Sequence, residues 1–303
     1  MAVKALLHYA LEVPDQTVGE TFYRDFGLTP VSARDEAVHF KPQPLARDAV
    51  RLYAGPKKRL RYLAFGAPGA DFDATRAALS QAGVPEVDAP KSVGDASGFW
   101  VRDPDGNLVN VRNEGQELPP AEPPLTLNSP GHSPRVGARG YPEPAPPRPR
   151  RLGHVLLFTP DINRQIGFYQ RALGMKLSDR AQSIVAFMRC TSDHHNLAFL
   201  TSAGPGFHHG SFEVGSVDEI AMNAQTMQDA GWKPGWGLGR HVIGSNYFFY
   251  MRDPWGSFVE YFHDLDCIPE GCAWAARDFP PEDSLYRWGP PVPDDFGLNR
   301  ELE

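Results

Sequence analysis

The sequence predicts an α+β fold made of two similar halves, each an open barrel built from two tandem βαβββ modules. Two observations lead to this prediction. Four landmarks recur in the same order in residues 1–117 and 150–270, and in each half strand patterns alternate with two helix patterns. The chain has 303 residues, of which 41% are hydrophobic, so it can build two cores of ordinary size.

The first landmark is a strand that ends in Pro-Asp and leads into a helix. Residues 8–15 match residues 154–161 in this pattern, and both stretches begin with histidine. Each helix pattern then ends in an aromatic pair followed by glycine, at residues 21–28 in the first half and 167–175 in the second. A strand and a helix are therefore expected at the start of each half.

The aromatic pair with its glycine is the second landmark, and the third is another strand followed by another helix. Residues 61–65 match 208–212, and the helix patterns that follow end at Gly83 and Gly231. The distances along the chain agree as well. His8 and Tyr62 are 54 residues apart, and His154 and His209 are 55 apart. A repeat of this kind predicts a second strand in the same place in each half.

The last landmark is a hairpin. In the second half, two aromatic, strand-like runs at residues 247–251 and 257–262 flank the turn Asp253-Pro254-Trp255-Gly256. Residues 103–110 match this turn and its second strand. Glu260 lies in the second strand among apolar residues, where a carboxylate is costly to bury unless a cation or hydrogen-bond donors meet it.

Two segments lie outside the repeat. Residues 118–149 are rich in proline and lack periodicity, which predicts an extended linker; the sequence leaves open whether it is disordered or an ordered crossover. Residues 271–303 form a C-terminal tail, which either covers the site or contacts another subunit. The predicted units are thus 1–117, 118–149, 150–270 and 271–303.

Composition excludes several classes of function. A formal charge of −7 and a pI near 5.8 disfavour nucleic acid and anionic membranes as partners. No apolar run approaches transmembrane length, and the N-terminal one is too short for a signal peptide. The three cysteines form no framework. These features predict a soluble protein of the reducing cytoplasm.

The two halves differ at the landmarks that carry polar side chains. The second half has His154, His209 and Glu260, whereas the first has the weaker set His8, Tyr62 and Asn110. Two histidines and one carboxylate form the facial triad of non-haem Fe(II) enzymes that use O2, although zinc or manganese can occupy the same ligands. The sequence therefore predicts one metal ion, held by the second half alone.

Strand alternation predicts which of two neighbouring histidines is the ligand. Side chains alternate between the faces of a strand. His208 shares its face with the apolar Phe212, which should pack under a helix, so His209 should point into the barrel. His208 is accordingly expected to be a structural neighbour of the site.

Further polar groups cluster in the second half, which holds seven of the ten histidines. His195 lies on a strand pattern of the metal-bearing module, and His241 and Tyr250 lie on the segment that leads to Glu260. Two interpretations remain open at this point. The three residues are polar core groups that shape the barrel, or they lie near the metal and supply acid–base catalysis and hydrogen-bond donors.

These segments resemble a known family. Residues 152–155, 194–198, 208–212 and 239–260 are similar to those of type I extradiol ring-cleavage dioxygenases of the vicinal-oxygen-chelate (glyoxalase-like) superfamily, the catechol 2,3-dioxygenase and dihydroxybiphenyl dioxygenase group. The resemblance implies Fe(II) as cofactor, a catechol and O2 as substrates, a ring-opened semialdehyde or oxo-dienoate as product, a metal-free N-terminal copy and a homo-oligomer. It also implies a role for each residue singled out above: His154, His209 and Glu260 as Fe(II) ligands, His195 as acid–base catalyst, and His241 and Tyr250 as hydrogen-bond partners of the substrate oxygens.

One segment departs from the family pattern. The apolar residues Val242 and Ile243 follow His241, where dihydroxybiphenyl-cleaving members have polar residues, so a less polar pocket wall is expected. Two alternatives are retained. The first is a glyoxalase-like metal isomerase or thiol transferase, which usually draws ligands from two paired modules. The second is a non-catalytic binding protein of the bleomycin-resistance kind, which needs no metal ligands.

Overall fold

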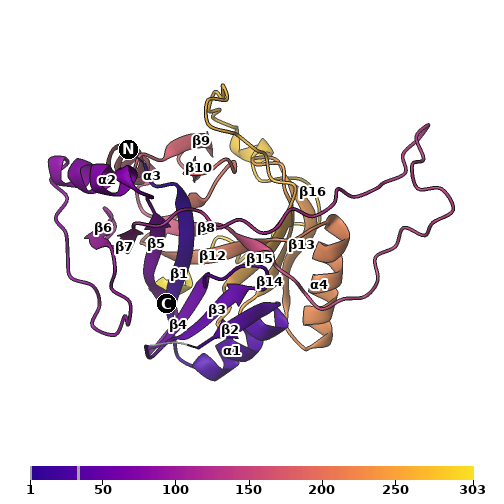
Figure 1. The fold of residues 1–303 in the computed structure, drawn as a ribbon, viewed down its shortest axis with the longest axis horizontal. Helices are drawn as coiled ribbons and strands as arrows, with labels where there is room; N and C mark the ends of the chain where they lie inside the picture. The colour runs from indigo at the N-terminus through magenta and orange to yellow at the C-terminus, as the bar shows by residue number, and fades with distance from the viewer. Residues whose placement is uncertain (1, 33–34) are drawn as a thin grey trace.

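Two curved sheets, one in each half of the chain, form the framework of the molecule (Figure 1). The computed structural model describes residues 2–32 and 35–303. Within these residues the first half contains β1 (Ala5–Val13), α1 (Gln16–Asp25), β2 (Leu28–Val31), β3 (Val38–Pro42), β4 (Val50–Ala54), β5 (Arg59–Gly66), α2 (Ala70–Gln81), β6 (Phe99–Arg102) and β7 (Leu108–Arg112).

The second half repeats this order, with one more strand after its second helix and a further strand near the C-terminus. It contains β8 (Arg151–Thr159), α3 (Ile162–Leu173), β9 (Lys176–Ala181), β10 (Val185–Arg189), β11 (Leu197–Thr201), β12 (Gly206–Glu213), α4 (Val217–Asp229), β13 (Pro234–His241), β14 (Tyr247–Arg252), β15 (Phe258–His263), the 3-10 helix η1 (Pro281–Asp283), β16 (Tyr286–Trp288) and the 3-10 helix η2 (Arg300–Leu302). No helix in the described ranges is long and apolar enough to cross a membrane.

The strand pairings repeat between the halves. In the first sheet β1 pairs parallel with β4 and antiparallel with β5, which pairs parallel with β7. In the second sheet β8 makes the same pairings with β11 and β12, and β12 pairs parallel with β15. The predicted α+β fold of repeated modules is confirmed. One detail was wrong: in the described chain no strand lies between α2 and β6, so the second module of the first half has two strands after its helix instead of three.

The repeated Asp and Gly landmarks cap the first helix of each half. The Asp15 carboxylate accepts hydrogen bonds from the backbone N–H groups of Thr17 and Val18 at the start of α1. Asp161 accepts one from Arg164 at the start of α3. Such caps satisfy backbone donors that the first helical turn leaves free. Gly174 ends α3 with a left-handed φ of 68°, which glycine adopts without strain.

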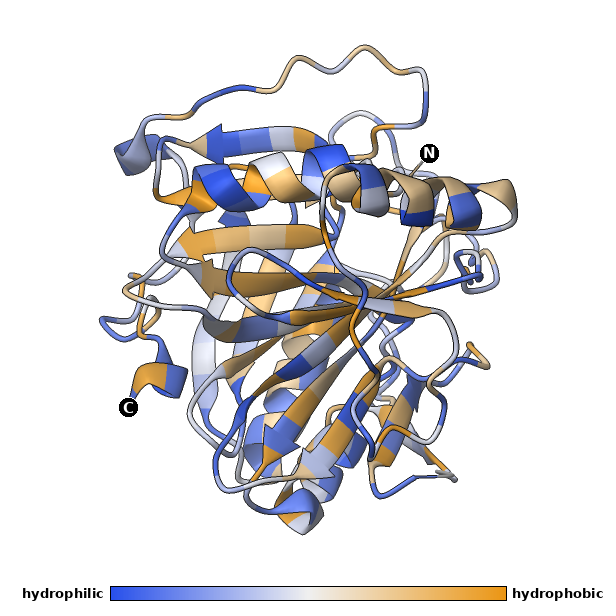
Figure 2. Ribbon diagram, turned by 90° about the vertical axis from the view of Figure 1, so that its left-hand side faces the viewer, coloured by the Kyte–Doolittle hydropathy of each residue, from blue (hydrophilic) through white to orange (hydrophobic). Residues whose placement is uncertain are grey.

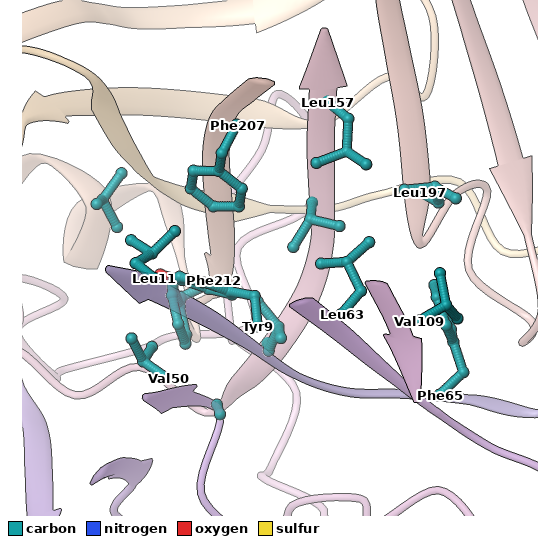
Figure 3. Packing of buried hydrophobic residues seen from close by; sticks show 14 of the residues in the cluster. Tyr9, Leu11, Val50, Leu63, Phe65, Val109, Leu157, Leu197, Phe207 and Phe212 are labelled. Atoms are coloured by element: carbon teal, nitrogen blue, oxygen red, sulfur yellow. The ribbon is translucent and has the colours of Figure 1, made fainter. Parts of the chain in front are cut away.

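The main hydrophobic core lies between the two sheets and joins both halves (Figure 3). The Tyr9 ring of β1 lies 4.9 Å from the Phe207 ring of β12. After α1, the Phe26 ring stacks on the Tyr261 ring of β15 at 4.0 Å, and the Tyr261 hydroxyl donates to the Phe26 carbonyl at 2.9 Å. Figure 2 shows orange, hydrophobic stretches along the strands in the middle of the molecule. Each half therefore buries one face of its sheet against the other half.

Because this face of each sheet is committed to the shared core, the opposite face forms the interior of each open barrel. Along β8, Val155 and Leu157 lie in the shared core, whereas His154 and Leu156 line a cavity on the other side. The alternation of side chains along a strand accounts for this division. The fold thereby places the polar landmark residues of β8 inside the second barrel.

The segment between the halves runs as an extended arm away from the body (Figure 1). In the described chain, residues 113–150 contain no helix and no strand, and the only β-bridge there joins Ser129 to His132. In the tail, β16 pairs antiparallel with β13 at the edge of the second sheet. The proposed division at residues 117, 149 and 270 remains a prediction.

The stack of Phe26 on Tyr261 predicts a large loss of stability on truncation. Phe26 is completely buried and also packs edge-on against Phe212 at 5.6 Å. Phe26→Ala should lower the free energy of unfolding by about 3 to 5 kcal/mol, as other buried Phe truncations do. Urea unfolding followed by tryptophan fluorescence measures the change. Leu127→Ala, in the exposed arm, is the control and should lie within about 0.5 kcal/mol of wild type; equal stability of the two variants would contradict the prediction.

Candidate metal centre and substrate cavity

Three side chains meet at one point because β12 lies between β8 and β15. Ser211 of β12 is paired with His154 on one side and with Glu260 on the other. His209, two residues before Ser211, points to the same face. One ligand atom from each of His154, His209 and Glu260 lies within 4.8 Å of the others. The sheet register therefore gathers the three predicted ligands on the floor of the second barrel.

Glu260 is the only acidic member of this group, and its side chain is completely buried. Its Oε2 atom lies 3.1 Å from His154 Nε2 and 3.4 Å from His209 Nε2. Burial alone would raise the pKa of the Glu260 carboxyl, but the two histidines outweigh that effect and hold the pKa well below its usual range. The carboxylate is therefore charged at neutral pH and requires positive charge beside it.

The position of one proton follows from a backbone carbonyl. His208 Nε2 lies 2.7 Å from the Phe296 carbonyl oxygen, which can only accept, so this nitrogen carries a proton. Burial, followed by the charge of His209, lowers the pKa of His208 well below its usual range, so the ring is neutral and its Nδ1 is bare. Nδ1 of His209, 2.7 Å away, must then be the donor to it.

Because these two hydrogen bonds place the proton of His209 on Nδ1, its Nε2 keeps a free lone pair, which is directed at the Glu260 carboxylate. Two acceptors facing each other repel unless a cation lies between them. Among the described residues, His209 Nε2 and His154 Nδ1 are buried nitrogens without a hydrogen-bond partner. Two imidazoles and one carboxylate form a donor set that suits a divalent transition metal with open coordination positions. The residues present thus fit a metal ion.

His208 itself does not line the cavity, but the strand-phase argument for its position was wrong. The register of β12 against β8 shifts between Phe207 and His209, so a β-bulge interrupts the alternation. The His208 ring packs against Phe258 at 5.5 Å and Phe296 at 4.7 Å, on the aromatic side of the cavity wall. It therefore lies beside His209 and donates to the C-terminal tail.

The corresponding place in the first half is filled by protein. His8 Nε2 lies 3.3 Å from the Tyr62 hydroxyl, which also accepts a hydrogen bond from Arg51 at 3.0 Å. The Asn110 amide donates to two backbone carbonyls. Burial, and next the Arg51 guanidinium, lowers the pKa of His8 well below its usual range. A fixed cation at this place opposes the binding of a second metal ion.

A cavity of about 360 Å³ opens above the three residues of the second half. Strands of the second sheet form one side of it, and the tail closes the other through Pro281, Leu285 and Phe296. Most of its wall is apolar. The residues of the wall away from His154 and His209 include Ile184, Val185, Phe187, Leu200, Ile243, Leu285, Val292 and Pro293.

His195, His241 and Tyr250 all line this cavity beside the three predicted ligands. The His195 ring lies 4.2 Å from the His154 ring, and burial lowers the pKa of His195 well below its usual range. His241 Nδ1 lies 2.7 Å from the Leu285 carbonyl, so it carries the proton. His241 Nε2 therefore accepts the Tyr250 hydroxyl, 3.0 Å away, and burial lowers the pKa of this imidazole to about 4.

Two contributions to the site were missing from the sequence predictions. Asn246 lines the cavity, and its amide nitrogen lies 3.4 Å from Glu260 Oε1. The second contribution is the pair of backbone carbonyls of Leu285 and Phe296 in the tail. The tail itself lines the cavity, which was one of the two alternatives expected for it. Asn246 stands in the same stretch as His241 and Tyr250, which was the available signal. The tail carbonyls had no signal, because a backbone acceptor has no residue type.

The chain is similar to known proteins in sequence and in fold. Residues 5–111 and 151–261 match the family model "Glyoxalase/Bleomycin resistance protein/Dioxygenase superfamily". The chain is 46% identical to Metapyrocatechase 2 of Cupriavidus necator over 99% of this chain and 93% of that protein. It is 29% identical to the Iron-dependent extradiol dioxygenase of Rhodococcus jostii, over 46% of this chain and 50% of that one. The Mn(II)-bound glyoxalase from Novosphingobium aromaticivorans has a similar structure, with a TM-score of 0.78, 25% identity, and coverage of 100% of this chain and 99% of that one.

Removing either predicted ligand on β12 or β15 should abolish metal binding. His209→Ala and Glu260→Ala should each retain less than about a tenth of the metal of wild type, because two remaining ligands hold a divalent ion poorly. Metal content per chain, measured after anaerobic loading with Fe(II) and desalting, tests this expectation.

The matched control is Asn110→Ala, at the corresponding position of the first half, which should keep the full metal content. Wild type should bind one ion per chain. Two ions per chain, or full occupancy in Glu260→Ala, would refute the assignment of the site.

Proposed function

The chain belongs to the Glyoxalase/Bleomycin resistance protein/Dioxygenase superfamily, and on that premise we propose that it is an Fe(II)-dependent extradiol ring-cleavage dioxygenase. Its substrates are a catechol and O2. Ring opening breaks the carbon–carbon bond beside one hydroxyl-bearing carbon, and both oxygen atoms of O2 enter the ring-opened product. Identity of 46% to Metapyrocatechase 2 over nearly the whole chain supports this activity.

The observation that carries the proposal is the convergence of His154, His209 and Glu260, with the lone pair of His209 Nε2 unpartnered, at one end of a largely apolar cavity. His154, His209 and Glu260 lie on one side of the point where their ligand atoms converge. The open side of that point leads into the cavity, where His195, His241 and Tyr250 stand. A catechol bound there would direct its two oxygens toward the three ligand residues and place its ring among apolar side chains.

Iron is the metal we propose for this site. The name of the Rhodococcus relative supports it, as does the match of the donor set to the facial triad of O2-using iron enzymes. When bound, Fe(II) supplies Lewis acidity and a route for electrons between a catechol and O2.

The polar residues of the cavity then have distinct roles. We assign the acid–base role to His195, whose neutral imidazole takes a proton from a catechol hydroxyl and returns it to one of the two oxygen atoms of O2 as the O–O bond breaks. Tyr250 and His241 form a linked pair that positions one substrate oxygen by hydrogen bonding. The tail covers this end of the cavity and excludes water from it.

Two alternative functions fit less well. A glyoxalase-like isomerase is the natural rival, since a Mn(II)-bound glyoxalase shares the fold. In this chain, however, one half supplies all three donors, and the other half carries Arg51 at the corresponding place. A purely binding protein of the bleomycin-resistance kind has no need for the bare His209 nitrogen or for a cavity lined by His195.

One experiment separates these functions. Purified protein loaded with Fe(II) is mixed anaerobically with catechol and then exposed to air, and a yellow ring-opened product with equimolar O2 uptake is expected. Protein that consumes no O2 but isomerises a glutathione hemithioacetal would establish the glyoxalase function instead. Protein that binds catechol without consuming it would indicate a binding protein.

The substrates, cellular location and assembly of the protein follow from the same proposal. A catechol and O2 are the proposed small-molecule partners. A cytoplasmic location and a homo-oligomeric assembly remain predictions.

The cavity wall also indicates which catechols fit. Away from the metal centre the described wall contains one charged residue, Asp294, and no Lys or Arg. Ile243, which was expected to make the wall less polar, is 3% exposed and lines the cavity. We infer that the ring substituent is uncharged and apolar, because a substrate carboxylate would be buried there without a cation.

Activity on substituted catechols should follow the polarity of the substituent. We expect kcat/KM for 3-methylcatechol and 4-methylcatechol to exceed that for 3,4-dihydroxybenzoate by at least about 100-fold, equivalent to about 2.7 kcal/mol. O2 uptake across this panel gives the ratios. Leu200→Arg, which places a cation in the wall, should reduce the ratio of kcat/KM between the methylcatechols and 3,4-dihydroxybenzoate. A wild-type preference for the carboxylated substrate would overturn the inference.

Replacing the proposed acid–base group should spare binding and slow the chemistry. His195→Gln should keep Fe(II) and bind catechol anaerobically, while kcat falls about 100- to 10,000-fold, the usual contribution of a general acid–base group. Stopped-flow mixing of the variant–catechol complex with O2 measures the loss. Ring opening at the wild-type rate would reject the role, and loss of iron would identify His195 as a ligand.

A further inference from the structure

A buried chain of polar groups leads away from the cavity behind His195. His194 Nδ1 lies 3.0 Å from His195 Nδ1, and His194 Nε2 lies 2.8 Å from Asp179 Oδ2 on β9. Asp179 is 3% exposed and His194 is completely buried. Neither residue lines the cavity, and neither has a role in the function proposed above.

The carboxylate decides the direction of the hydrogen bonds in this chain. A charged carboxylate only accepts, so His194 Nε2 carries a proton and donates it to Asp179. With His194 neutral, its Nδ1 is bare and accepts the proton on His195 Nδ1. His195 then presents a bare Nε2, the one ring nitrogen not engaged with His194, to the cavity that it lines.

The surroundings hold the chain rigidly in place. The backbone N–H of Arg277 donates to Asp179 Oδ1 at 2.6 Å, so both carboxylate oxygens are engaged. Trp274 packs edge-on against the His194 ring at 5.6 Å, and its indole N–H donates to the Ser178 carbonyl. Phe187 lies 4.9 Å from His195. The first part of the C-terminal tail therefore covers the chain and shields it from water.

We propose that Asp179 and His194 are positioning residues that hold His195 with its bare Nε2 toward the bound catechol. When His195 takes a proton from a catechol hydroxyl, the resulting imidazolium keeps its Nδ1–H on His194, and the buried charge of Asp179 stabilises it through that ring. No bond other than the O–H bond of catechol and the new N–H bond of His195 changes. This inference rests on the acid–base role proposed for His195.

Asp179→Asn tests the hydrogen-bonded series from Asp179 to His195, because the new side chain has nearly the same shape as the old one. The amide can donate to His194 Nε2, which reverses both hydrogen bonds and leaves His195 with a protonated Nε2. We expect kcat to fall about 10- to 100-fold, the usual effect of disturbing a supporting partner. The KM for catechol, anaerobic catechol binding and Fe(II) content should stay within about twofold of wild type. Asp278→Asn, an exposed carboxylate of the same tail contact, is the control and should be unaffected.

A pair of variants at position 194 separates proton placement from packing. His194→Asn can still offer an acceptor to His195, whereas His194→Leu cannot, so kcat should follow the order wild type, His194→Asn, His194→Leu. Since the two residues act in series, Asp179→Asn combined with His194→Leu should lose no more kcat than the worse single variant. These variants also decide the matter if Asp179→Asn proves unstable.

The outcomes are distinct. A loss of kcat with unchanged KM, metal content and thermal midpoint supports the positioning role of Asp179 and His194. Wild-type kcat in Asp179→Asn and His194→Leu overturns it, as does a rise in KM together with equal loss in both His194 variants. If the wild type itself opens no catechol ring, the proposed function fails, and that failure is visible before any variant is compared.

Discussion

The site depends on one electrostatic constraint, the burial of the Glu260 carboxylate in the middle of the second sheet. Burying a charge is costly without a counter-charge, and the imidazole nitrogens beside the carboxylate belong to His154 and His209. If His209 were free to protonate its Nε2, the three groups would satisfy one another as an ordinary ion pair. The contact of His208 with the Phe296 carbonyl prevents this, because it keeps the proton of His209 on Nδ1. The His209 lone pair, which faces the carboxylate, is thereby left for a metal ion.

Around the cavity, other hydrogen-bond acceptors fix the tautomers of the remaining histidines in the same way. The Phe296 carbonyl determines which ring nitrogen carries the proton in His208 and, through it, in His209. The Leu285 carbonyl does so for His241. Asp179 does so for His194 and, through it, for His195. Two of these acceptors belong to the C-terminal tail, and the third is held by the tail residue Arg277. The tail thus decides where the nitrogen lone pairs of the site point, in addition to closing the cavity.

The duplicated architecture explains why one half can bind metal while the other supports it. Each sheet packs one of its faces in the shared core, where pairs such as Phe26 and Tyr261 join the halves. Each is left with an inner face that must be filled. In the first half Arg51, Tyr62 and Trp100 fill it with side chains, whereas in the second a cavity remains. The first half therefore acts as a platform that supports the sheet carrying the three ligands.

The sequence by itself determined the repeated α+β fold and the residues that meet at the site. Internal repetition supplies this information, because matched landmarks such as His154 with His8 and Glu260 with Asn110 report the same strand register twice. Only the tertiary structure decided the bulge at His208, the missing third strand after α2 and the filling of the first barrel by Arg51. It alone also placed Asp179 and the tail carbonyls behind the histidines. These features arise from contacts between residues far apart in the chain, often through backbone atoms, and such contacts leave no periodicity or spacing in the sequence.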